Sequence, residues 1–171
     1  MDCRASTFVL ICLIMKRYLL LLLLSPSLII AQENEMIPLQ EYIDGITGEI
    51  GYAEGLYISY RCIGLYSMML PLVQQSKNEE TPALVERLEN SQTTLIVAAQ
   101  QFFKLTSTDY SEEDFTNNMT NSVLPMVNNY QLEANKSWTN TGSYFNDYLQ
   151  EEGEICKMMT MSFDDAFGEA Q

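Results

Sequence analysis

Residues 50–75 read IGYAEGLYISYRCIGLYSMMLPLVQQ, and this stretch decides the fold. Apolar and small residues recur in it at alternating steps of four and three, which places them on one stripe of a helix. The stripe consists of Tyr52, Leu56, Ser59, Ile63, Tyr66, Leu70 and Val73. Pro71 is expected to kink or loosen the last turn. We therefore predict a helix from about residue 50 to residue 75, with this stripe against a core.

Three later stretches, residues 82–105, 112–137 and 143–161, repeat the same spacing. Four amphipathic helices joined by short connections predict an all-α protein, an up-and-down four-helix bundle over residues 50–162. Residues 32–49 form a lead-in that is either a short helix or rich in turns. No stretch alternates with a period of two, so we expect no sheet.

The helix ends carry their own signals. Thr81 is a suitable N-cap for the second long helix, with Pro82 as its first residue. Ser111 followed by Asp114 resembles a capping box at the start of the third long helix. The acidic tail, residues 163–171, is expected to fray.

The first 31 residues have the pattern of a secretory signal peptide. The basic pair Lys16-Arg17 precedes a thirteen-residue apolar stretch that ends before Ala31, and we predict cleavage after Ala31. Met15 is an alternative start, in which case residues 1–14 are a mis-called upstream extension. The rival interpretation is an uncleaved anchor, but Lys16-Arg17 would then lie in the bilayer at a cost of several kcal/mol. We expect export to a periplasm or the medium, and membrane contact only if the segment stays uncleaved.

Beyond this segment we find no second apolar run of membrane length. Cys62 and Cys156 are the two cysteines that remain after cleavage. Exported chains meet oxidising conditions, and the first and last helices of an up-and-down bundle are neighbours, so we predict a Cys62–Cys156 disulfide. Two separate buried thiols are the alternative.

The composition excludes several classes of function. The 171 residues include 23 acidic and 9 basic side chains, give a net charge of −14, and contain no histidine. Such a charge repels phosphate backbones, so we expect no nucleic-acid partner, and it favours basic or cationic partners instead. Without histidine there is no Ser-His-Asp triad and no histidine metal site. We therefore expect neither an enzyme nor a cofactor.

Glu152 is the most informative single residue, because it lies on the apolar stripe between Leu149 and Cys156. A buried carboxylate is unfavourable unless it is paired or protonated. Arg61 is a natural partner if the first and last long helices pack together. We expect Glu152 to lean out to solvent at the edge of the stripe. A buried pair with Arg61 and a ligand or catalytic carboxylate are the two alternatives.

The sequence also suggests a ligand pocket lined by Tyr60, Tyr66, Glu152 and Met159, although tyrosine and methionine at helical spacing also suit plain core packing. Our leading hypothesis is an exported acidic helical bundle with a binding or structural accessory role, whose partner is a protein or a small molecule. The alternative is a carrier of a small apolar or aromatic molecule in a core lined by tyrosine and methionine. A hydrolase that uses carboxylates such as Glu152 is third.

Overall fold

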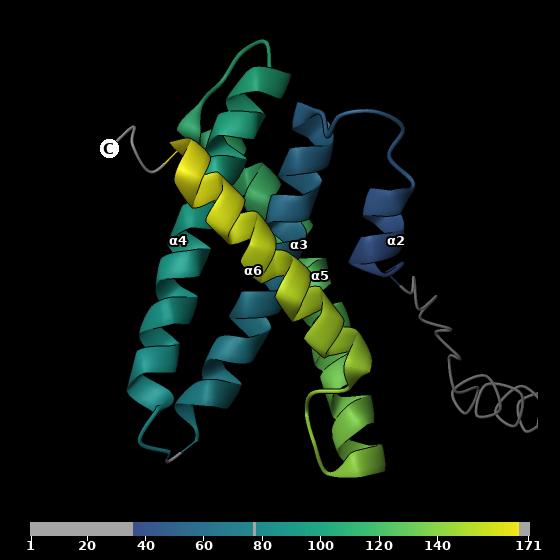
Figure 1. Cartoon of the computed structure of the whole chain (residues 1–171). Helices are drawn as coiled ribbons and strands as arrows, with labels where there is room; N and C mark the ends of the chain where they lie inside the picture. The colour runs from purple at the N-terminus through teal and green to yellow at the C-terminus, as the bar shows by residue number, and fades with distance from the viewer. Residues whose placement is uncertain (1–35, 77, 168–171) are drawn as a thin grey trace, which may run out of the picture. The chain divides into compact units, whose positions relative to one another are not determined.

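The structure is a computed structural model that describes residues 36–76 and 78–167. The chain divides into two compact units, Met1–Asn34 and Glu35–Gln171, and every described residue belongs to the second. The predicted signal peptide, with its basic pair and cleavage position, lies outside the described residues. Within the described ranges every regular element is a helix and there is no strand, which confirms the all-α class (Figure 1).

The described part of the chain contains five helices instead of the four that we predicted. The four long helices correspond to the predicted stretches, and the additional short helix lies in the lead-in, so the four-helix architecture is not confirmed. The helices are α2 (Leu39–Asp44), α3 (Tyr52–Gln74), α4 (Thr81–Thr106), α5 (Glu112–Thr141) and α6 (Asp147–Phe167). Pro71 and Pro125 both lie inside helices that continue past them.

The helix starts agree with the sequence in one case and differ in two. The Ser111 hydroxyl oxygen accepts a hydrogen bond from the backbone N–H of Asp114 at 3.0 Å, which confirms this cap. The predicted Thr81 cap is wrong, because Thr81 is already the first residue of α4 and the N-cap position holds Glu80 without a side-chain bond. The start of α6 at Asp147 lies later than expected.

The late start of α6 has a local cause. The Asn146 side-chain oxygen accepts a hydrogen bond from the backbone N–H of Leu149 at 3.0 Å, so Asn146 caps the helix. At its other end α6 extends to Phe167, into the stretch that we predicted as a tail. Phe163 is buried there, and its ring packs edge-on against the Phe102 ring at a centroid distance of 5.4 Å.

Helix α3 is the centre of the core. It contacts α4, α5 and α6, and Figure 1 shows α6 crossing it. Every residue from 58 to 66 is buried, so the prediction of a single apolar stripe is wrong for this part of α3. Apolar residues such as Ile58 and Leu65 occupy the opposite side, and a helix that is apolar all round is buried all round.

By length and composition, α3 is also the one helix in the described ranges that could cross a membrane, which the sequence analysis had not recognised. This resemblance to a membrane-spanning helix is weak evidence, because the central helix of a soluble protein can have the same length and composition. More than half of its most apolar stretch is buried inside the protein.

A disulfide between Cys62 and Cys156 joins α3 to α6 and confirms the predicted pairing. The two Cα atoms are 5.3 Å apart, and both side chains are fully buried. The bridge fixes how far α6 is shifted along α3, and this alignment determines which side chains meet at the neighbouring turns.

Candidate functional site

A buried ion pair lies one turn from the disulfide. Arg61 precedes Cys62 on α3, and Glu152 lies four residues before Cys156 on α6. The Arg61 Nη2 atom is 2.7 Å from Glu152 Oε2, and neither residue is more than 1% exposed. The expectation that Glu152 leans out to solvent is therefore wrong, and the structure shows the alternative, a buried pair with Arg61.

Three tyrosines surround this pair, each from a different helix: Tyr57 on α3, Tyr130 on α5 and Tyr148 on α6. Arg61 Nε donates to the Tyr130 hydroxyl at 2.9 Å, and that hydroxyl donates a short hydrogen bond to Glu152 Oε2. Arg61 also donates to the hydroxyls of Tyr57 at 3.3 Å and Tyr148 at 3.5 Å. We call these five residues the ion-pair cluster.

The lead-in covers the ion-pair cluster. We call residues 36–44 the strap; they comprise a short extended stretch and helix α2. The backbone carbonyl of Ile37 accepts a hydrogen bond from Arg61 Nη1 at 3.0 Å, and the backbone N–H of Leu39 donates to Glu152 Oε1 at 2.5 Å. The Leu39 side chain is fully buried. The strap is thus held by one bond from each member of the ion pair.

The cluster leaves no hydrogen-bonding capacity unused on Arg61. A guanidinium has five N–H donors, and the bonds to Ile37, Tyr57, Tyr130, Tyr148 and Glu152 account for all five. Among the described residues, no buried side-chain nitrogen or oxygen lacks a partner. The two charges are therefore balanced, each Arg61 N–H has an acceptor, and both Glu152 carboxylate oxygens accept hydrogen bonds.

The electrostatics of the cluster favour this protonation state. Burial would lower the pKa of the Arg61 guanidinium, but the neighbouring Tyr130 and Glu152 raise it, so the side chain is charged. Burial raises the pKa of the Tyr130 hydroxyl well above its ordinary value, and the Glu152 charge raises it further. The pKa of Tyr148 rises to about 12, chiefly through burial and then through Glu152. All three groups therefore keep their protons at neutral pH.

The four residues of the predicted pocket lie in different surroundings. Tyr60 donates a hydrogen bond to the Asn118 side chain on α5 at 2.9 Å, and burial raises its pKa to about 12. Tyr66 is buried, Met159 is partly buried against the core, and Glu152 belongs to the ion-pair cluster. Tyr60 bonds to Asn118, while Glu152 bonds to Arg61, Tyr130 and Leu39. A ligand site formed by the four stays a prediction.

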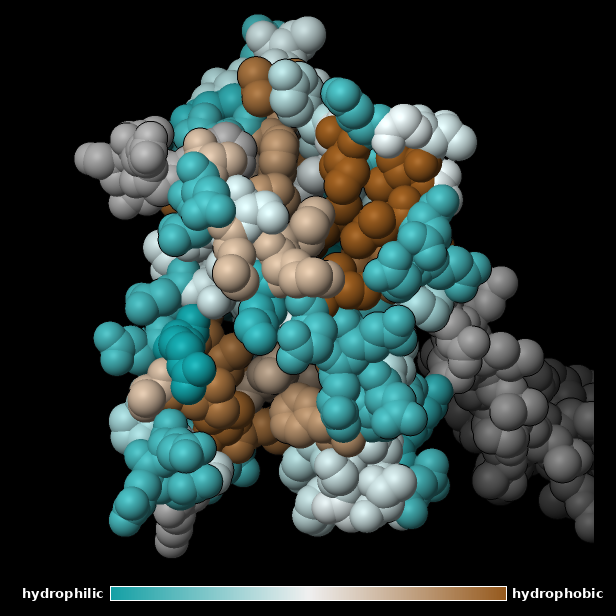
Figure 2. All heavy atoms as spheres, viewed as in Figure 1, coloured by the Kyte–Doolittle hydropathy of each residue, from teal (hydrophilic) through white to brown (hydrophobic). Residues whose placement is uncertain are grey.

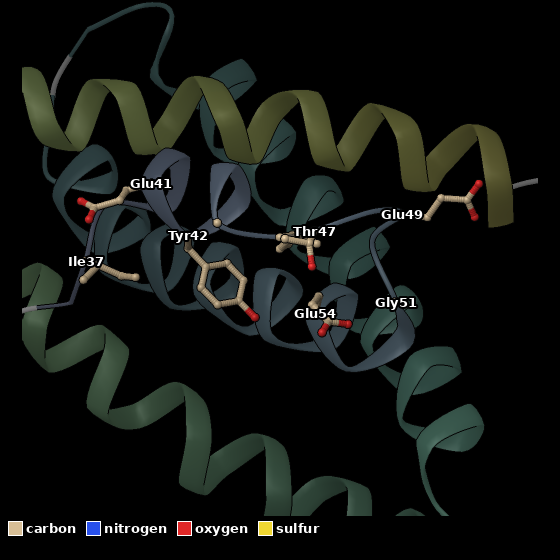
Figure 3. Close-up of a pocket in the computed structure, with 9 residues that line it drawn as sticks. Ile37, Glu41, Tyr42, Thr47, Glu49, Gly51 and Glu54 are labelled. Carbon is tan, nitrogen blue, oxygen red and sulfur yellow. The ribbon is translucent and has the colours of Figure 1, made fainter.

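The structure shows a different concave site, an open pocket of about 620 Å³ between the strap and the first turn of α3. We call it the acidic pocket (Figure 3). Its lining residues are Ile37, Glu41, Tyr42, Gly45, Ile46, Thr47, Glu49, Gly51 and Glu54. Figure 2 shows hydrophobic residues gathered between α2 and the start of α3, with hydrophilic residues around them.

Three carboxylates are spread along the acidic pocket. In Figure 3 the Tyr42 hydroxyl points toward Glu54, while Glu41 and Glu49 lie toward opposite ends. Burial raises the pKa of Tyr42, and the Glu54 charge raises it further. Within the described ranges, no basic side chain lies within ion-pair distance of any of these three glutamates. Negative charge in the pocket is therefore not compensated by the protein's described residues.

Sequence reasoning missed the acidic pocket, because its residues follow no motif. The available signal was three glutamates between residues 41 and 54 without a basic residue among them.

Nowhere among the described residues do three or more acidic or cysteine side chains gather closely enough to hold a metal ion.

The acidic pocket and the ion-pair cluster share the strap as a common wall. The Tyr42 ring packs against the Tyr57 ring at a centroid distance of 4.5 Å, which links the two sites directly.

Comparison of the chain with models of protein families, with curated proteins and with solved structures gave no match.

Proposed function

We propose that this protein is an exported, non-enzymatic binding or accessory protein, and that the acidic pocket binds a basic segment of its partner. The observation that carries this proposal is the uncompensated charge of Glu41, Glu49 and Glu54 around a concave, partly apolar surface. A pocket of several hundred Å³ is of the size that accommodates a ligand or a few side chains.

The arrangement of the carboxylates favours an extended ligand over a single ion. Because Glu41 and Glu49 lie toward opposite ends of the pocket, they suit several positive charges along a chain. Tyr42 between them offers an aromatic ring to a lysine or arginine side chain, an interaction worth about 0.5–1 kcal/mol at exposed sites. A peptide segment rich in lysine or arginine meets both requirements.

The remainder of the fold would serve as a rigid support for this pocket. We propose that the four long helices run up and down, because the connections between them, residues 75–80, 107–111 and 142–146, are short. The disulfide and the ion-pair cluster tie α3, α5, α6 and the strap together. Neither the disulfide nor the ion-pair cluster contributes a free catalytic group, which favours binding over hydrolysis.

Export is supported by two independent features. One is the basic pair Lys16-Arg17 followed by an apolar stretch and Ala31, and the other is the disulfide, a bond typical of oxidising compartments. Intact-mass measurement of the protein recovered from the medium or periplasm tests this part. We expect a chain that begins at Gln32, with a mass two hydrogens below that of the dithiol form.

Isothermal titration of the mature protein with a synthetic lysine- and arginine-rich peptide tests the pocket. We compare a pocket variant, E41Q/E49Q/E54Q, with a control variant of equal charge, E86Q/E89Q/E151Q, whose glutamates are all exposed elsewhere. The pocket variant should bind at least about tenfold more weakly, and the control about as tightly as the wild type. Equal weakening of both variants would show a general charge effect and would refute the pocket.

A further inference from the structure

We propose that the ion-pair cluster is a peptide-binding site which the strap occupies in its own chain, and which accepts the same segment from a second copy of the protein. The ligand class is an extended Ile-Pro-Leu-type segment. This proposal concerns the inner side of the strap and does not rest on the function proposed for the acidic pocket.

The contacts at the strap are those of peptide recognition. Arg61 binds the carbonyl of Ile37, and Glu152 binds the N–H of Leu39, so the two opposite charges hold the backbone on either side of Pro38. The Leu39 side chain is fully buried and belongs to the hydrophobic core. In peptide recognition, main-chain hydrogen bonds supply affinity and a buried side chain supplies specificity.

Pro38 suits its position between the two bonds. Its φ of −52° and ψ of 140° are those of an extended, polyproline-like residue. Proline has no N–H, so no backbone donor is left without a partner at this position. Its ring also restricts the free segment to the bound conformation, which reduces the entropy lost on binding.

The strap is also detachable in principle. Helix α2 has six residues, of which Leu39 is buried and Tyr42 and Ile43 are partly buried against the core, and a helix this short is not stable without tertiary contacts. Residues 45–51, GITGEIG, join it to α3, and Gly48 has a φ of 104°, which favours glycine. Segments with few buried contacts open at a lower free energy than the core does. The strap can therefore leave while α3, α5 and α6 stay packed.

A second copy is the occupant that the structure supports, because complementarity to the cluster is shown for this sequence. A strap from another copy would make the same bonds to Arg61 and Glu152, which is the basis of exchange between identical chains. The short linker favours the strap of the same chain, since tethering gives it an effective concentration in the millimolar range. Binding of a strap from a second copy becomes measurable when the strap of the same chain no longer occupies the site.

The test uses a fluorescently labelled peptide of residues 35–45, EMIPLQEYIDG, added to the full chain with its disulfide intact. In the Leu39→Asp variant the strap is displaced, because a carboxylate cannot occupy the apolar space beside Glu152. Fluorescence anisotropy should show the peptide binding this variant at least about tenfold more tightly than the wild type, whose own strap competes. Binding no tighter than to the wild type would overturn the proposal.

A matched peptide isolates the predicted bond. With an N-methyl group on the leucine corresponding to Leu39, the peptide keeps its side chain but has no N–H for Glu152. It should bind the Leu39→Asp variant at least about tenfold more weakly than the parent peptide, and equal binding would refute recognition by Glu152.

A second variant covers the case in which Leu39→Asp does not fold, as judged by circular dichroism. A protease site replaces Thr47-Gly48, and cleavage leaves the strap bound without a covalent link. The labelled peptide should then displace the cut strap, which mass spectrometry detects as exchange of one segment for the other. A cut strap that stays bound against a large excess of peptide, or a folded cut chain that takes up no peptide, would contradict the proposal.

Discussion

The two sides of the strap present the same kind of residue in opposite circumstances. On the inner side Glu152 is buried and its charge is balanced by Arg61, while on the outer side Glu41 and Glu49 are exposed and have no basic partner within the described ranges. A carboxylate inside a protein is stable only when it is paired and hydrogen-bonded, whereas one in water needs no partner. The inner carboxylate is therefore occupied within the molecule, by Arg61, Tyr130 and the strap, and the outer ones are exposed to a partner.

The largest loss of stability is expected on removal of the Cys62–Cys156 disulfide, which aligns α6 with α3 at the ion-pair cluster. The C62A/C156A double variant loses a bridge that closes a loop with a sequence separation of 94 residues, which is worth up to about 4–5 kcal/mol of unfolding free energy in the chain-entropy model. Urea unfolding measures this loss. Unchanged stability would show that the ion-pair cluster alone aligns α6 with α3.

The next effect tests whether the buried charges depend on each other. Arg61→Leu leaves Glu152 buried without its counter-charge, and we expect a loss of about 3–5 kcal/mol, with a similar loss for Glu152→Leu. The double variant R61L/E152L should lose less than the sum, because no unpaired charge remains. Urea unfolding of the three variants forms a double-mutant cycle, and simple additivity would contradict a coupled pair.

Alkaline pH should destabilise the fold through tyrosines whose hydroxyls have raised pKa values, one of which, Tyr148, belongs to the ion-pair cluster. The pKa values of Tyr148 and Tyr60 are about 12 in the folded protein, and an unfolded tyrosine titrates near 10. A raised folded pKa means that the stabilisation is complete below about pH 10 and is lost as the pH rises from there through 12.

Urea unfolding at pH 9 and pH 11 measures this dependence. We expect lower stability at pH 11, and a smaller difference in Tyr148→Phe, which has no hydroxyl to ionise. If the wild type were equally stable at pH 9 and pH 11, the tyrosine hydroxyls would not be buried in the way that the structure shows.

The smallest effect is expected on the outer side. The E41Q/E49Q/E54Q variant should change the free energy of unfolding by no more than about 0.5 kcal/mol, as is usual for surface substitutions, even though it removes three charges. Thermal and urea unfolding against the wild type measure it. A loss of several kcal/mol would mean that these glutamates support the fold, and the contrast between the two sides of the strap would disappear.

Much of the inner side could be predicted from the sequence. The helical spacing located four long helices, and the position of Glu152 on an apolar stripe marked it as unusual. Arg61 could be named as a candidate partner because it lies beside Cys62, but we expected Glu152 in solvent, since spacing alone does not show how deeply a stripe is buried. The hydroxyl of Ser111 and the Asp114 N–H likewise formed the expected cap. These are short-range signals, or they follow from one alignment of two helices.

The strap and the acidic pocket could not be predicted in the same way. The bond from Leu39 to Glu152 joins residues 113 positions apart, and no periodicity links them. The lead-in gives no clear helix signal, so its position depends on tertiary contacts, those of the buried Leu39 and of the partly buried Tyr42 and Ile43. The outer pocket forms only because the strap lies beside the first turn of α3, which brings Glu41 and Glu54 into the lining of one pocket.

Hydrogen exchange at the Leu39 amide tests whether the buried ion pair holds the strap. Leu39 is the first residue of α2, so its N–H has no partner within the helix, and among the described residues Glu152 is the acceptor that protects it. We predict exchange at least about a hundredfold slower than for the amide of Gly48 in the exposed linker, measured by NMR and corrected for the intrinsic rates. Exchange of Leu39 as fast as Gly48 would show that the ion pair does not hold the strap.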